Sequence, residues 1–293
     1  MAMPGLPAVD ARSDIGMSAS DPIVIPPGGG EVIGDSPDRT VLVLSDCDEL
    51  HATWSRFAAV RDGAGLHIHR DHTDLFYVLE GELTVKLADD EEVAAGAGTL
   101  VSIPPLVVHG FRNASDADVK YLNLHTPGCG FIGYMRGLRD KEPIEFDQHD
   151  PEGVGGLRPA SEIAIGGEEF VLKGDGQREA LLCDIEALAI SEIVAEQGAP
   201  TPEPHLHPDH VESFFVLEGE AGLVIGAEEV GAGTGTWLQV PAGVPHEISF
   251  AAGPARMLTL HTPAAAFGDF LRALDETDES EALARSGFDQ RQA

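Results

Sequence analysis

The stretch Gly65-Leu66-His67-Ile68-His69-Arg70-Asp71-His72-Thr73-Asp74 is repeated later in the chain as Glu203-Pro204-His205-Leu206-His207-Pro208-Asp209-His210-Val211-Glu212. Corresponding histidines and the closing carboxylates lie 138 positions apart. Each copy continues into an apolar segment ending in Glu-Gly-Glu, and a later proline-containing segment ends in a further histidine, His109 or His246. Three histidines and one carboxylate per copy predict two divalent metal sites, or one site and its decayed copy.

The spacing within each copy explains how the ligands would converge. Side chains alternate faces along a β-strand, so the two histidines of His-x-His point the same way and the residue between them, Ile68 or Leu206, faces the packed side. Five positions later, after a turn, the next antiparallel strand brings Asp74 or Glu212 back beside the imidazoles. The fourth ligand must come from a distant strand, and prolines before it suit a strand start.

The predicted ligands are imidazoles and carboxylates, which suit iron, manganese, nickel, copper or zinc. The lack of cysteine ligands argues against a purely structural zinc site. We predict one divalent transition metal per half, held by two sets of residues: His67, His69, Asp74 and His109, and His205, His207, Glu212 and His246.

The two halves are not expected to be equivalent. Asp74 is one methylene shorter than Glu212, so the first site is predicted to bind metal more weakly, to bind a different metal, or to bind none. His72 and His210 also correspond, and we interpret them as turn or pocket-rim residues, with a supporting or substitute ligand role as the alternative. For the strand-end residues His125 and His261 a structural role is favoured over ligation.

These motifs resemble those of cupins, and the duplication resembles a bicupin. The first cupin motif, G-x5-H-x-H-x4-E-x6-G, is matched around His205 and Glu212, with Gly219 closing it; the first half has Gly81 but Asp74 in place of the glutamate. The second motif, G-x5-P-x-G-x2-H-x3-N, corresponds to two sets of residues: Gly98, Pro104, Leu106, His109 and Asn113, and Gly235, Pro241, Gly243, His246 and Phe250. The resemblance implies an all-β fold of two double-stranded β-helix (jelly-roll) barrels, each followed by a short helix.

The resemblance is closest to quercetin dioxygenase-like bicupins. It implies a metal that holds a deprotonated hydroxyl or enolate and organises dioxygen attack, with Glu212 as ligand and catalytic base. The expected substrate is small, partly hydrophobic, and bears a hydroxyl or carbonyl group. A metal-dependent isomerase or lyase, and a non-catalytic ligand-binding cupin, are the alternatives.

Strand alternation also predicts which residues line the two pockets. They are Phe76, Phe111 and Asn113 in the first half, and Phe214, Ile248 and Phe250 in the second. Ordinary filling of a barrel core explains the same pattern equally well.

The amino-acid composition disfavours some classes of binding partner. Fifty acidic against eighteen basic residues give a formal charge of −32, which disfavours nucleic acid and anionic membranes as partners. No apolar run approaches the roughly 20 residues of a membrane span, and no signal peptide is recognised. Three scattered cysteines suggest no disulfide framework, so we expect a cytoplasmic acidic protein that binds a small molecule. A homo-oligomer is left open.

The repeat also predicts the organisation of the chain. We expect an N-terminal arm (1–22), a first barrel (23–150), a linker (151–157) rich in glycine, and a second barrel with a tail (158–293). Each His-Thr-Pro element (125–127 and 261–263) should lead into a short helix, at 130–138 or 264–274, and then an extended tail. Each tail contains Phe-Asp-Gln, at 146–148 and 288–290.

Overall fold

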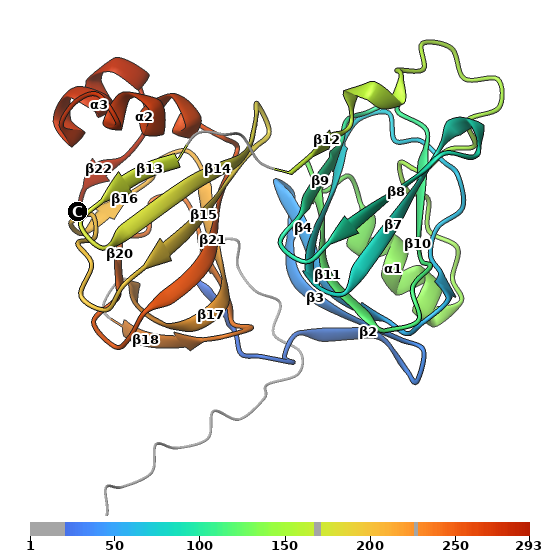
Figure 1. Cartoon of the computed structure of the whole chain (residues 1–293), viewed down its shortest axis with the longest axis horizontal. Helices are drawn as coiled ribbons and strands as arrows, with labels where there is room; N and C mark the ends of the chain where they lie inside the picture. Colours follow the sequence, from blue (N-terminus) through green and yellow to red (C-terminus); the bar gives the residue numbers. More distant parts are fainter. Residues whose placement is uncertain (1–20, 167–170, 226–227) are drawn as a thin grey trace, which may run out of the picture.

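The computed structural model describes residues 21–166, 171–225 and 228–293 and shows two antiparallel β-barrels side by side (Figure 1). This confirms the predicted all-β class with short helices. All pairings between the named strands in these ranges are antiparallel. The predicted arm lies mostly outside the described residues.

The first barrel consists of a seven-stranded sheet, in the order β12-β9-β6-β11-β4-β3-β2, facing a four-stranded sheet, β5-β10-β7-β8. The strands encoded before residue 130 are β1 (Ile23–Ile25), β2 (Glu31–Ser36), β3 (Arg39–Cys47), β4 (Leu50–Phe57), β5 (Arg61–Asp62), β6 (Thr73–Glu80), β7 (Glu82–Leu87), β8 (Glu92–Gly96), β9 (Leu100–Ile103), β10 (His109–Asn113) and β11 (Val119–Thr126).

The second barrel is built on the path β13-β14-β15-β21-β17-β20-β16-β22, to which β18 and β19 add through β17. The later strands are β12 (Ala164–Ile165), β13 (Val171–Gly174), β14 (Gln177–Ile185), β15 (Leu188–Ala195), β16 (His205–Leu206), β17 (Val211–Ile225), β18 (Glu228–Gly233), β19 (Trp237–Val240), β20 (His246–Ser249), β21 (Ala255–Thr262) and β22 (Arg291–Gln292).

The helices follow the strands, as expected, with one correction. They are α1 (Phe131–Asp140), α2 (Phe267–Leu274), α3 (Glu279–Ser286) and the short 3-10 turns η1 (Ala88–Asp90) and η2 (Ala160–Glu162). Helix α3 lies in a tail that was expected to be extended. It begins where the Asp278 carboxylate accepts a hydrogen bond from the backbone N–H of Glu281, and it ends at Gly287, whose φ is +72°.

Two short strands depart from the domain division drawn from the sequence. Strand β1 pairs with β19 of the second barrel, and β12 pairs with β9 of the first. Domain limits at residues 23 and 158 place β1 in the first domain and β12 in the second. In the structure, β1 belongs to the second barrel and β12 to the first. The physical reason is that each connecting segment crosses the interface and completes a free strand edge of its neighbour.

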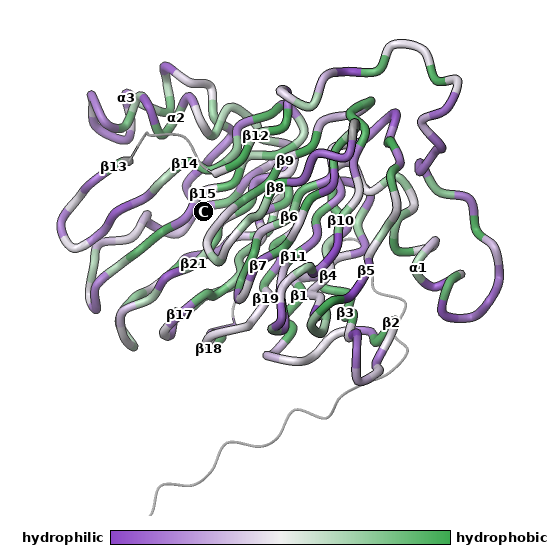
Figure 2. Tube along the Cα trace, turned by 45° about the vertical axis from the view of Figure 1, so that its right-hand side comes forward, coloured by the Kyte–Doolittle hydropathy of each residue, from purple (hydrophilic) through white to green (hydrophobic). Residues whose placement is uncertain are grey.

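A shared apolar core joins the barrels. It contains Leu75 and Leu122 from the first half together with Phe215, Trp237 and Leu258 from the second. Beside it, the Tyr77 hydroxyl donates a hydrogen bond to Glu192 Oε2 over 2.9 Å. Figure 2 shows hydrophobic residues gathered along the strands, whereas α3 is largely hydrophilic.

The Glu-Gly-Glu elements require glycine. Gly81 and Gly219 have φ of +77° and +79°, and a Cβ on either would lie 2.4 Å from the Asp118 carbonyl oxygen or 2.0 Å from that of Pro254. In the first half Gly81 separates β6 from β7, as predicted. In the second, β17 continues through Gly219 and changes partners from β19 to β18. Among the described helices none is long and apolar enough to cross a membrane.

Candidate metal centres

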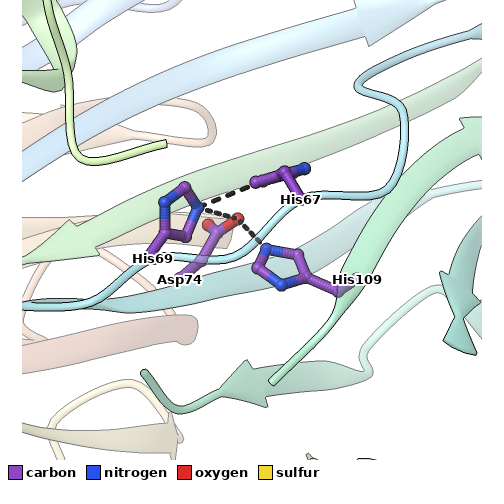
Figure 3. Close-up of side chains that lie close together, drawn as sticks. All are labelled: His67, His69, Asp74 and His109. Atoms are coloured by element: carbon purple, nitrogen blue, oxygen red, sulfur yellow. Dashed lines mark hydrogen bonds and ion pairs between the residues drawn. The ribbon is translucent and has the colours of Figure 1, made fainter. Parts of the chain in front are cut away.

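The first predicted ligand set comes together inside the first barrel. His67 and His69 lie in the segment before β6, Asp74 lies on β6, and His109 begins β10. All four side chains are buried, and their donor atoms lie within 4.8 Å of one another. Figure 3 shows the three imidazoles and the carboxylate pointing toward one another.

Hydrogen bonds orient the histidines of this first centre. The Nδ1 atoms of His67 and His109 lie 2.7 Å from the Gly65 oxygen and 2.9 Å from the Val107 oxygen, and Nδ1 of His69 contacts the Asp147 carbonyl oxygen. Because a carbonyl only accepts, each Nδ1 carries the proton and each Nε2 presents a lone pair.

The facing nitrogens fit a bound cation. Nε2 of His67 lies 3.2 Å from Nε2 of His69. Burial and the charges of His109 and His69 lower the pKa of His67 to about 3, so this imidazole is neutral at pH 7. Two opposed lone pairs and a nearby carboxylate form a donor set that suits a divalent transition metal.

The second ligand set converges in the same way. His205 lies on β16, Glu212 on β17 and His246 on β20, with His207 between the first two, and all four are buried. Nδ1 of His205 lies 2.8 Å from the Glu203 oxygen, and Nδ1 of His246 lies 3.0 Å from the Val244 oxygen. The donor geometry of the first centre is thus repeated for two of the three histidines.

The reach of the carboxylate distinguishes the centres. Glu212 Oε2 lies 3.0 Å from Nε2 of His207 and 2.7 Å from Nε2 of His246. Asp74 Oδ2 lies 3.8 Å and 3.4 Å from the corresponding atoms of His69 and His109. In addition, Asn123 Nδ2 donates to Asp74 Oδ1 over 2.6 Å and so holds the other oxygen.

Burial and neighbouring charges set the electrostatics of both centres. Burial alone would raise the pKa of both carboxylates, but the surrounding histidines hold the pKa of Asp74 and of Glu212 well below the usual range. For His207, burial would lower the pKa, yet Asp289 and Glu212 outweigh it and raise this pKa to about 9.

A second layer of histidines stands behind each carboxylate. His125 Nε2 lies 3.6 Å from Asp74 Oδ1, and His125 Nδ1 lies 2.9 Å from His72 Nε2. The second barrel repeats both contacts: His261 Nε2 lies 3.6 Å from Glu212 Oε1, and His261 Nδ1 lies 2.9 Å from His210 Nε2. His72 and His210 directly follow the bends at 70–71 and 208–209, as the turn assignment expected, but both are buried in this layer. Their burial contradicts a pocket-rim role and favours the supporting role given as the alternative.

Residues of the Phe-Asp-Gln tails complete the layer, and the sequence reasoning did not assign them to the site. The Asp147 carboxylate lies 2.9 Å from His72 Nδ1, and that of Asp289 lies 2.6 Å from His210 Nδ1. Phe146 and Phe288 pack against the second histidine of each His-x-His, with ring centroids 5.5 and 5.2 Å apart. The repetition of Phe-Asp-Gln was the available signal.

A cavity of about 270 Å³ opens onto the first centre. It reaches three of the predicted ligands, His67, His69 and Asp74. Its charged lining residues include Arg39, Arg61 and Asp62. Its aromatic wall includes Phe57, Phe111, Tyr121, Phe131, Tyr134 and Phe146.

The predicted pocket residues lie in different environments. Phe111 lines the cavity. Phe76 packs in the core of the first barrel, and three others fill the core of the second: Phe214, Ile248 and Phe250. Asn113 is a structural residue, because its Nδ2 donates to the Ala58 and Ala117 carbonyls over 2.9 and 2.7 Å. Core filling, the alternative left open by alternation, accounts for these residues.

Comparison with known families agrees with the duplicated geometry. The cupin domain model matches the chain twice, over residues 56–125 and 191–261. The chain is a bicupin. Each matched segment contains one complete set of predicted ligands.

Similar proteins include enzymes of several kinds. The bicupin is 22% identical over 254 residues to quercetin 2,3-dioxygenase of Bacillus subtilis (strain 168), covering 74% of each chain. Its fold is similar to that of salicylate 1,2-dioxygenase from Pseudaminobacter salicylatoxidans, with a TM-score of 0.60, 16% identity and 88% of each chain covered. An oxalate decarboxylase has a TM-score of 0.58 and 15% identity, with 92% of this chain and 87% of the other covered.

Proposed function

We propose that this bicupin is a metal-dependent, dioxygenase-like enzyme whose reaction takes place at the first metal centre. Its substrate would be small and partly hydrophobic, with a hydroxyl or carbonyl oxygen. The observation that carries the proposal is the cavity of about 270 Å³ that reaches His67, His69 and Asp74. A site of this kind, apolar with a few convergent polar groups, is typical of small-molecule binding.

The ligands proposed for the metal are His67, His69, Asp74 and His109 in the first centre, and His205, His207, Glu212 and His246 in the second. When bound, a transition metal would supply Lewis-acid and redox chemistry toward an oxygen-bearing substrate. The chain's own contribution is preorganisation. Bonds from Nδ1 to backbone oxygens fix Nε2 of every ligand histidine except His207, Asn123 fixes Asp74, and the aromatic wall holds the substrate away from water.

For the second centre we propose that Glu212 serves as a metal ligand. Both contacts of Glu212 Oε2 go to imidazole nitrogens of the ligand set. The catalytic-base role predicted from the sequence is tested by comparing Glu212→Gln with Asp74→Asn. Loss of activity in Glu212→Gln without loss of metal from either centre would support that role.

Dioxygenases among the similar proteins support the reaction class. The oxalate decarboxylase of similar fold shows that the architecture does not fix the reaction. An isomerase or lyase, and a ligand-binding protein without turnover, are therefore the competing functions.

The test is oxygen consumption by untagged protein loaded in turn with iron, manganese, nickel, copper or zinc. Phenolic and dicarbonyl compounds are supplied as substrates. We expect uptake with at least one compound, abolished by His69→Ala and retained by the matched variant His207→Ala. Bound metal without oxygen uptake for any compound would reject the dioxygenase. Uptake that survives His69→Ala would reject the first centre as its site.

A further inference from the structure

The first-barrel cavity contains a cationic side chain that the metal site does not use. Arg39, at the start of β3, lines this cavity together with His67, His69 and Asp74. Among the described residues the Arg39 side chain makes no hydrogen bond or ion pair. The nearby Asp38 carboxylate is already bound by Arg61 over 2.5 Å and by Ser36 over 2.6 Å.

Acidic residues outnumber basic ones by fifty to eighteen in this chain. Three other arginines of the described residues also lack a side-chain hydrogen bond or ion pair, but Arg70, Arg178 and Arg291 are exposed, whereas Arg39 is half-buried. By contrast, four other partly exposed arginines contact carboxylates at 2.6–3.1 Å: Arg56, Arg112, Arg136 and Arg256. A half-buried guanidinium without a carboxylate gives up part of its hydration without a charged partner in return. The arrangement is therefore suited to an anion that enters from outside the chain.

The carboxylates near Arg39 have other partners: Asp74 belongs to the metal centre, and Asp38, which also attracts Arg39 electrostatically, is hydrogen-bonded to Arg61. Arg61 is held by Asp38, and the exposed Asp62 carboxylate lies 3.6 Å from Lys86 Nζ. Burial raises the pKa of Tyr121 on the same wall, so its hydroxyl stays protonated; Ser55 and Arg39 oppose the rise. A guanidinium matches a carboxylate with two parallel N–H···O bonds.

The second barrel lacks this feature at the equivalent position. Arg39 pairs with Phe57 in the β3–β4 hairpin, and Gln177 pairs with Ala195 at the same place in the β14–β15 hairpin. Two residues further on, Val41 of the first barrel corresponds to the buried Glu179 of the second. The cation is thus replaced by an amide, and a carboxyl group is added, which disfavours an anionic ligand.

We propose that the first-barrel cavity selects small aromatic or otherwise apolar carboxylates, with Arg39 as the residue that binds the carboxylate. The inference rests on the proposed function in placing the substrate beside the first metal centre. The aromatic wall of Phe111, Tyr134 and Phe146 contacts the apolar part of the ligand, and the metal centre faces its oxygen.

Calorimetric binding to the metal-loaded full chain, under nitrogen, tests this inference. The probes are two matched pairs: 2-hydroxybenzoate with 2-hydroxybenzamide, and phenylacetate with phenylacetamide. We expect at least one carboxylate to bind ten-fold or more tightly than its amide. Arg39→Gln, which installs the residue of the second barrel, should remove that preference and leave amide affinity unchanged, and Arg39→Lys should retain part of it.

The matched control is Arg178→Gln, an exposed arginine on β14, which should bind all four probes like the parent protein. Val41→Glu, which installs the carboxyl of the second barrel, should reduce carboxylate affinity independently of Arg39 truncation. No carboxylate preference in either pair, or a preference that survives Arg39→Gln, would overturn the inference. Arg39-dependent binding without any oxygen uptake would preserve it and reject the dioxygenase function instead.

Discussion

The two metal centres have the same ligand spacing but different surroundings. In the second, Glu212 reaches two imidazole nitrogens at 3.0 and 2.7 Å, while the neighbouring Phe214 and Phe250 fill the core. In the first, Asp74 Oδ2 lies 3.8 and 3.4 Å from the imidazole nitrogens of His69 and His109, and a cavity opens beside it. The comparison indicates that the barrel fixes which residues converge, whereas one methylene and the lining residues decide what each centre can do.

The largest effect is expected from Glu179, which has an apolar counterpart in the first barrel, Val41. Burial raises the pKa of Glu179 to about 7, opposed by the hydrogen bond from Ser191, and the Glu212 charge adds to the rise. From about pH 4.5 the unfolded chain loses this proton while the folded protein keeps it until about pH 7. The contribution of Glu179 to stability therefore falls by about 3 kcal/mol over that range.

Denaturant unfolding at several pH values checks this difference. Glu179→Val should be more stable than the parent above pH 7, and the gap should narrow as the pH falls to 4.5. Val41→Leu is the matched control and should leave the pH profile unchanged. A gap of constant size across this range would show that Glu179 is not the group responsible.

A smaller effect is expected where the tails support the histidines. Removing such supporting hydrogen bonds typically costs 10–100-fold in metal affinity. Asp289 lies near both His210 and His207, at 2.6 and 3.7 Å, whereas in the first half His69 contacts the backbone oxygen of Asp147 instead. Asp289→Asn should therefore weaken metal binding in its half more than Asp147→Asn does in the other, as measured by competition with a chelator. Equal losses would contradict this reading of the tails.

Exchanging the two carboxylate side chains tests directly whether their length sets the metal affinity of each centre. Asp74→Glu should raise the metal affinity of the first centre several-fold, provided that the longer side chain fits without overpacking. Glu212→Asp should lower that of the second by a similar factor. Spectroscopic titration with a coloured divalent metal such as Co²⁺ measures both. A loss of affinity on lengthening Asp74 would indicate that Asn123, which holds Asp74 Oδ1, sets the geometry instead.

The smallest effect concerns the glycine that the first half lacks. Leu106 has φ of +67°, close to the +77° of Gly243, and the two backbone N–H groups each donate over 2.7 Å to the carbonyl of His69 or His207. A left-handed conformation costs a non-glycine residue about 1–2 kcal/mol. Leu106→Gly should stabilise the protein by up to about 1 kcal/mol, and Gly243→Ala should destabilise it by about 1 kcal/mol. Thermal unfolding checks both, and a destabilised Leu106→Gly would show that the side-chain contacts outweigh the strain.

The sequence predicted the barrels and the convergence of the ligands because both depend on short-range periodicity. His-x-His, the carboxylate five residues later, and the distant histidine occupy positions that strand alternation places on one face. The exchange of β1 and β12 could not be predicted, since strands of three and two residues carry no periodic pattern. Helix α3 was missed because it is short and mostly polar, although Asp278 and Gly287 are recognisable end signals.

The pocket was the least predictable part of the site. Alternation placed Phe214 and Phe250 on the inward face correctly, but it cannot tell whether an inward side chain borders a cavity or fills the core. Arg39 escaped notice because a lone arginine at the start of a strand is usually a surface residue. Its significance depends on which acidic groups its neighbours already bind, and this is visible only in three dimensions.

Metal titration of His69→Ala and His207→Ala tests the central comparison most directly, because each variant retains one intact centre. Both variants should bind one metal ion where the parent binds two. We predict a lower dissociation constant for His69→Ala, which reports the second centre with Glu212 in full reach. Equal constants, or tighter binding in His207→Ala, would contradict the account.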